Sequence, residues 1–212
     1  MSKSKPNFVY SSDPGLILGF HGCEKSVRDA VVNEQTMLLS SNKIHEWLGH
    51  GTYFWQNNYE RALDFVTHPP DGRKISTPAV LGAVISLDNC LDLMDAQYIE
   101  HVRAYYNSLK KIVAKQGMTL PRNKHKKGTS NLWDKVLREL DCYVIENLHK
   151  VMKTANIRPF DSVRGVFIEG DAIYPDAGFY DKTHIQVCIR NPNCIKGFFI
   201  PRKEVDWPEN IL

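Results

Sequence analysis

Two short segments place residues that can bind a flat, amide-bearing ligand at the ends of apolar stretches. The first reads Gly19-Phe20-His21-Gly22-Cys23, and the second reads Gly49-His50-Gly51-Thr52-Tyr53-Phe54. Glycine has no Cβ and lets a ligand lie close to the backbone, so the N–H and C=O groups beside Gly22 can grip an amide. If the strands that carry them pair, His21 and Tyr53 stand at the mouth of one cleft.

The two motifs, in this order and followed by a helix-like segment, resemble the ADP-ribosyltransferases of the poly(ADP-ribose) polymerase and diphtheria-toxin type. In that family the histidine holds the ribose of NAD, the glycine beside it pairs with the carboxamide, and the motif tyrosine stacks on the nicotinamide. The resemblance therefore implies NAD as co-substrate, bound by His21, Gly22, Gly51 and Tyr53. Phe65, on the following helix, is the candidate for the opposite face of the nicotinamide.

In the third motif of the family pattern, this sequence differs from the polymerases at one residue. Gln186 stands where the polymerases have a glutamate. Glutamine can form hydrogen bonds, but it carries no charge and is no general base. Elongation to a polymer is therefore not expected, and a single transfer needs another group, or the acceptor itself, to remove the proton. Glu169 is the first candidate for that role, followed by Asp176, Asp181 and His184, and His184 shares a strand face with Gln186.

The reaction that the resemblance implies is cleavage of the nicotinamide–ribose bond of NAD. One ADP-ribose then passes to a macromolecular acceptor, either a protein or a nucleic acid. Positioning and electrostatics would supply most of the rate enhancement, with His21, Tyr53, Gln186 and Glu169 as the predicted catalytic residues. By analogy, the compact size fits a toxin or phage-defence effector that an inhibitory partner protein holds in check.

Two other functions stay open. A non-catalytic module that binds NAD or ADP-ribose would use the same histidine and tyrosine and needs no carboxylate. An RNA-modifying transferase that uses NAD to remove a phosphate would require a set of arginines and a leading basic domain, which are not found in the sequence. A basic loop with Arg122, Lys124, Lys126 and Lys127 leans toward a nucleic-acid acceptor, although such runs are commonly solvated surface.

The elements that must position these residues are short strands and helices. Hydrophobic patterning predicts strands over 16–22, 79–87, 163–170, 183–189 and 195–200, and a strand or extended segment that begins with Met37–Leu39. Helices are predicted over 26–33, capped by Ser26, and from Asn57 or Asn58 to about Val66. From about 95 to 156 the apolar spacing is helical and predicts a helical hairpin inserted into, or packed beside, the sheet.

These elements predict one α+β domain over residues 1–212. The resemblance implies that its antiparallel sheets are split in the manner of ADP-ribosyltransferases, with flanking helices and the inserted hairpin.

Composition limits the remaining possibilities. The net charge of +3 permits an anionic ligand and demands none. Five cysteines without a CxxC pair indicate free thiols in a reducing cytoplasm. The scattered histidines predict no metal site. The polar start, Met1 to Asn7, is unlike a signal peptide, and no apolar run approaches the roughly 20 residues that a bilayer requires. A cytoplasmic protein without a membrane anchor is therefore expected.

Overall fold

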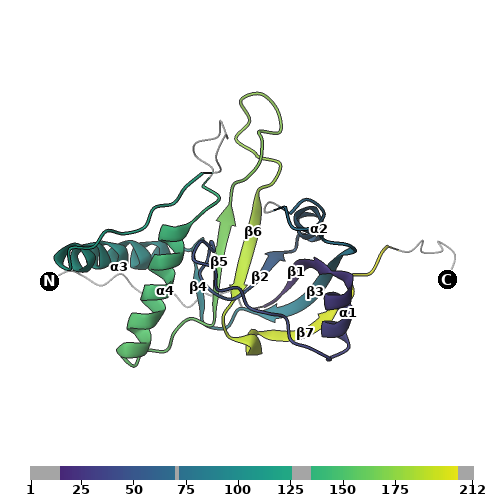
Figure 1. Cartoon of the computed structure of the whole chain (residues 1–212), viewed down its shortest axis with the longest axis horizontal. Helices are drawn as coiled ribbons and strands as arrows, with labels where there is room; N and C mark the ends of the chain where they lie inside the picture. Colours follow the sequence, from purple (N-terminus) through teal and green to yellow (C-terminus); the bar gives the residue numbers. More distant parts are fainter. Residues whose placement is uncertain (1–14, 70–71, 126–134, 205–212) are drawn as a thin grey trace.

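One mixed sheet of seven strands, mostly antiparallel, forms the centre of the protein (Figure 1). The computed structural model describes residues 15–69, 72–125 and 135–204. Within them the strand order is β4-β5-β6-β2-β1-β3-β7, and four α-helices accompany the sheet. The predicted α+β class is confirmed.

Most elements lie close to their predicted ranges, but no strand was predicted at Cys90–Asp92. The strands are β1 (Leu16–Glu24), β2 (Thr52–Gln56), β3 (Pro78–Ser86), β4 (Cys90–Asp92), β5 (Ser162–Phe167), β6 (His184–Ile189) and β7 (Ile195–Phe199). The helices are α1 (Lys25–Val32), α2 (Tyr59–Thr67), α3 (Ala96–Lys115) and α4 (Glu139–Thr154), with a 3₁₀ turn at Pro192–Cys194. The predicted cap of α2 is confirmed, because the side chain of Asn58 accepts a hydrogen bond from the Arg61 amide at 3.0 Å.

The sheet is weakly joined in its middle. Strands β1 and β2 pair only at Gly19–Gln56 and Phe20–Trp55, whereas β1 and β3 pair along their whole lengths, from Leu16–Ser86 to Glu24–Pro78. The sheet thus consists of two halves, β4-β5-β6-β2 and β1-β3-β7, that touch over one short stretch. This stretch lies immediately before His21 and Gly22 in β1.

Different helices cover the two halves. Helices α3 and α4 lie beside β4 and β5, and α1 and α2 lie beside β1 and β3 (Figure 1). Leu48 and Ile145 pack with Val163, Phe167 and Cys188 between α4 and the sheet. Helix α2 lies so close to β1 that a Cβ on Gly22 would sit 2.3 Å from the Ala62 carbonyl oxygen. A residue without a side chain is therefore required at Gly22 by packing alone.

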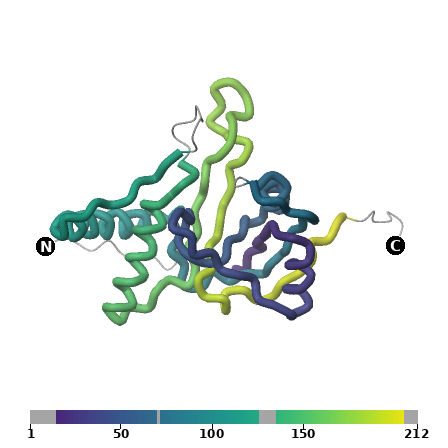
Figure 2. Tube along the Cα trace, viewed as in Figure 1, coloured from purple at the N-terminus to yellow at the C-terminus, as the bar shows by residue number. Residues whose placement is uncertain are grey.

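Two local predictions were wrong: the strand alternative at Met37–Leu39 and the cap at Ser26. Met37 and Leu39 are 69% and 86% exposed and belong to no strand, because the segment between α1 and β2 runs past the sheet toward α4 (Figure 2) and pairs only through an isolated bridge at Ser41–Gly51. Ser26 does not cap α1. Glu24 is the N-cap residue. Its carboxylate accepts hydrogen bonds from the backbone amides of Ser76 and Thr77 at 2.9 and 2.6 Å.

The predicted helical hairpin corresponds to α3 and α4, which pack together through Leu109, Val113 and Val144. Helix α4 begins later than the apolar spacing indicated, because Leu137 instead exchanges two backbone hydrogen bonds with Lys124. Lys126 and Lys127 of the basic loop and the polar start at Met1 to Asn7 lie outside the described residues. No described helix is long and apolar enough to cross a membrane.

Packing makes a direct prediction for Gly51. A Cβ there would lie 2.5 Å from both the Cys188 Sγ and the Ile189 carbonyl oxygen, so Gly51→Ala should lower the free energy of unfolding by about 1–3 kcal/mol. Urea denaturation measures this loss. Gly197→Ala is the matched control, since a Cβ at Gly197 meets nothing within 4 Å. Equal stability of the two variants would contradict the packing.

Candidate functional site

The candidate site lies where β2 stops pairing with β1. The Leu18 carbonyl accepts a hydrogen bond from the Asn57 amide at 2.9 Å, so Leu18 turns its backbone groups toward β2. Alternate residues of a strand turn these groups toward the same neighbour, and Phe20 and Gly22 therefore do the same. Pairing with β2 ends at Phe20. The N–H and C=O of Gly22 consequently point to the place where the partner strand has left the ladder.

His21 bridges the end of the ladder with its side chain. Its Nδ1 lies 2.8 Å from the carbonyl oxygen of Tyr53, and because a carbonyl only accepts, Nδ1 carries the hydrogen. Burial lowers the pKa of His21, and the bond to the Tyr53 carbonyl only partly opposes this effect. The imidazole is therefore neutral at pH 7, and its Nε2 is an acceptor suited to a hydroxyl group.

The phenol of Tyr53 is held by its own loop. Its hydroxyl donates to the Gly49 carbonyl at 2.5 Å and accepts from the Leu48 amide at 2.9 Å. Burial raises the pKa of Tyr53, so the hydroxyl stays protonated and is no proton-transfer group near neutral pH. The ring packs against the core cluster that contains Leu48 and Cys188. These contacts show a structural role for Tyr53, and its stacking on nicotinamide stays a prediction.

The side chains of His21, Tyr53 and Gln186 do not all point to the same face of the sheet. Tyr53 and Gln186 share a face, because Gln186 pairs with Trp55 and Tyr53 is two residues from Trp55. Phe20 pairs with Trp55 and therefore points to the same face as Trp55. His21 is the next residue of β1, so its side chain points to the opposite face, where its ring lies 5.9 Å from that of Phe54. The imidazole reaches Tyr53 only across the open strand edge.

Glu169 and His184 come together on the Gln186 side. The Glu169 carboxylate accepts from Arg61 Nη2 at 2.7 Å and lies 3.6 Å from His184 Nδ1, while that Nδ1 is 2.8 Å from the Lys182 carbonyl oxygen. Asp176 and Asp181 lie in the exposed loop between β5 and β6, and Asp181 there accepts the Asp171 amide. Of the acidic candidates, Glu169 is the one that faces this cluster.

Arg61 is the site residue that sequence reasoning missed. It joins α2 to the end of β5, with a side chain only 12% exposed. Its partner Glu169 lies 108 positions away in the sequence, and no local pattern marks such a pair. Arg61 neutralises the carboxylate that was expected to act as a base.

The other predicted binding residues have clear packing roles. Phe65 contacts Trp55, with ring centroids 4.9 Å apart, and Gly51 lets β6 approach. Neither arrangement excludes a ligand, and binding by these two residues stays a prediction.

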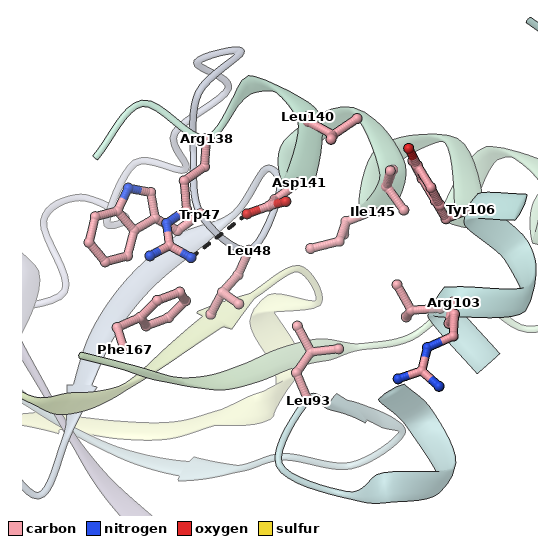
Figure 3. Close-up of a pocket in the computed structure, with 12 residues that line it drawn as sticks. Trp47, Leu48, Leu93, Arg103, Tyr106, Arg138, Leu140, Asp141, Ile145 and Phe167 are labelled. Carbon is pink, nitrogen blue, oxygen red and sulfur yellow. Dashed lines mark ion pairs between the residues drawn. The ribbon is translucent and has the colours of Figure 1, made fainter. Parts of the chain in front are cut away.

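An apolar cavity of about 350 Å³ adjoins the Tyr53 loop, between α3, α4 and the sheet (Figure 3). Leu48, Ile145 and Phe167 form part of its wall. The guanidinium of Arg138 lies over the Trp47 and Phe167 rings at 4.3 and 4.8 Å, a favourable cation–π arrangement. The cavity therefore has a charged rim and an apolar floor.

Comparison with protein-family models, with curated proteins and with solved structures finds no match to this chain.

The hydroxyl of Tyr53 makes a testable contribution to stability. Tyr53→Phe removes its two bonds and leaves the buried Leu48 amide without this partner, so the free energy of unfolding should fall by about 1–3 kcal/mol. Urea denaturation is the measurement, and Tyr59→Phe, at a residue that is 38% exposed, is the control. An unchanged stability in Tyr53→Phe would show that these bonds contribute nothing.

The pH dependence of stability should report on His184. Burial, helped by the charges of Arg61 and Arg138, lowers its pKa to about 4, against about 6.5 in an unfolded chain. The unfolded state thus binds the proton first as the pH falls, and stability should drop by roughly 3 kcal/mol between about pH 6.5 and 4.

Replacement of that ring tests the assignment. His184→Gln should show a smaller loss of stability than the wild type between those two pH values, measured by urea denaturation at each pH. His68→Gln removes an imidazole that is 77% exposed and should keep the wild-type profile. The same profile in His184→Gln as in the wild type would refute the role of His184.

Proposed function

We propose that this protein is a mono-ADP-ribosyltransferase that cleaves NAD and transfers one ADP-ribose to a macromolecular acceptor. One observation carries the proposal. The peptide groups of Gly22 point to the open edge of β1, beside a neutral His21. A primary carboxamide is flat and has one acceptor and two donor hydrogens, so one N–H and one C=O of the same residue can pair with it.

The weak junction between β1 and β2 supports the finer fold assignment. We propose that it corresponds to the split between the sheets of ADP-ribosyltransferases and that α3 and α4 form an insertion within that fold. Two residue pairs at this junction leave the strands free to diverge beyond Phe20, and an elongated dinucleotide can then lie across the edge.

Each residue has a limited task in the proposed reaction. Gly22 binds the carboxamide of nicotinamide, and His21 Nε2 accepts a ribose hydroxyl. As the bond from nicotinamide to C1″ breaks, the carbon becomes cation-like and the acceptor atom bonds to it, losing its proton. Gln186 can orient the ribose or the acceptor but cannot take that proton. Glu169 is the nearby carboxylate that can, provided that its ion pair with Arg61 shifts toward the acceptor.

A second function is favoured by that same ion pair. With Glu169 bound to Arg61 and a neutral amide at Gln186, the site holds no uncompensated carboxylate. A module that binds NAD or ADP-ribose without turnover would show this arrangement. The two functions differ in nicotinamide release, which only the transferase produces.

Incubation with NAD labelled in its adenylate half, together with a cell extract, distinguishes the two. The transferase releases nicotinamide and places label on macromolecules, and sensitivity of the label to nuclease or protease identifies the acceptor. Gln186→Ala should reduce labelling at least tenfold, because the amide lies on the face that carries the acid–base cluster. Gln116→Ala, at the end of α3, is the control. Tight NAD binding without nicotinamide release would establish the module, and no NAD binding would refute both functions.

A further inference from the structure

A second cavity, of about 410 Å³, lies beside the last turns of α4. Its walls come from the loop over residues 40–42, from His50 and Gly51 just before β2, from the segment 158–161 that leads into β5, and from the two residues that follow β6. Its volume lies within the range of about 300–1,000 Å³ typical of small-molecule sites. Most of its lining residues have polar side chains, which distinguishes it from the apolar cavity next to Tyr53.

His149 lines this cavity and holds a single buried acceptor. The residue is 2% exposed, and its Nδ1 lies 2.8 Å from the carbonyl oxygen of Ile145 in the same helix. Nδ1 therefore carries the hydrogen, and in the neutral ring Nε2 keeps a lone pair. That buried Nε2 has no hydrogen-bond partner among the residues that the structure describes. A buried acceptor of this kind needs a donor such as a hydroxyl group.

Cationic side chains line the same cavity. Lys153, one turn after His149 on α4, lines the cavity and has no ion-pair partner within the described ranges. Arg158 Nη2 binds Asp161 Oδ2 at 2.5 Å, which leaves most of its five N–H donors for another anion. Arg190 is less available, because Glu146 and the His50 carbonyl hold its guanidinium.

The one carboxylate in the wall is already compensated. Asp161 accepts from Arg158 and, at 2.8 Å, from the Asn191 side chain, and the Asn89 amide approaches it at 3.3 Å. Its charge therefore opposes an incoming anion only weakly. The cavity combines an anion-attracting rim with a buried acceptor that requires a hydroxyl donor.

We propose that this cavity binds a ribose phosphate. A ribose hydroxyl donates to His149 Nε2, and the phosphate lies against Lys153 and Arg158, while Ser41, Asn42 and Asn191 contact the remaining oxygens. This site is separate from the peptide groups of Gly22 that are proposed to bind the carboxamide, and it does not depend on NAD cleavage. A free nucleotide, an RNA strand and the ADP half of NAD all contain the required group.

Calorimetric titration at one salt concentration tests the proposal with AMP, inorganic phosphate and a short single-stranded RNA. AMP should bind the wild-type protein at least tenfold more tightly than phosphate, because phosphate alone supplies no ribose hydroxyl. Lys153→Ala should weaken AMP binding about tenfold. Lys150→Ala, on the same helix but outside the cavity wall, should leave it unchanged. His149→Phe should reduce the preference for AMP over phosphate.

The three probes, together with a titration of NAD, also separate the sources of the ligand. Tighter binding of RNA than of AMP, with an RNA affinity that falls steeply when the titration is repeated at higher salt, assigns the cavity to a strand. Equal or weaker binding of RNA, with an unchanged NAD affinity in Lys153→Ala, assigns it to a free nucleotide. A loss of NAD affinity in Lys153→Ala assigns it to the ADP half of NAD. Equal affinity for AMP and phosphate, or equal AMP binding by Lys153→Ala and Lys150→Ala, would overturn the proposal. Since AMP contains no nicotinamide, either result leaves the proposed transferase activity to its own assay.

Discussion

The hydrogen bond from the His21 imidazole to the Tyr53 carbonyl is the interaction on which the site depends. A backbone acceptor at the end of a broken ladder needs a partner, and the side chain supplies it in place of the next residue of β1. The imidazole thereby fixes its own tautomer and spans the gap between the two halves of the sheet. The peptide groups of Gly22 are left facing that gap. If β1 and β2 continued to pair at this position, the N–H and C=O of Gly22 would form hydrogen bonds with β2 and could not bind a ligand.

Charged residues from different elements meet beside the junction of the two halves of the sheet. Arg61 on α2 binds Glu169 at the end of β5, and this pair connects the two halves of the sheet on the side opposite the His21 ring. Burial keeps His184 neutral beside it. This side of the sheet therefore carries a compensated Arg61–Glu169 ion pair and an uncharged amide at Gln186. Such groups are better suited to positioning a ligand by hydrogen bonds than to removing a proton from it.

Most local structure was predictable because it follows from periodicity and turn chemistry. The apolar runs of β1 and β3 and the Asn58 cap of α2 are encoded by neighbouring residues. The strand alternative was wrong at Met37–Leu39, which belong to no strand, and the predicted cap was wrong at Ser26, because Glu24 occupies the N-cap position and no side chain caps α1. The Glu24 carboxylate accepts hydrogen bonds from the distant Ser76 and Thr77 amides, a pairing that no local pattern specifies.

By itself the sequence determined most of the elements, the α+β class and the residue types available for chemistry, since these depend on short-range patterns. Only the tertiary structure decided which groups meet. It placed the His21 ring on the face opposite the Tyr53 and Gln186 side chains, because the strand register sets the direction of every side chain. It also paired Arg61 with Glu169 and buried His149 without a partner for Nε2. Contacts between residues so far apart arise from the packing of whole elements, and no local sequence signal specifies them.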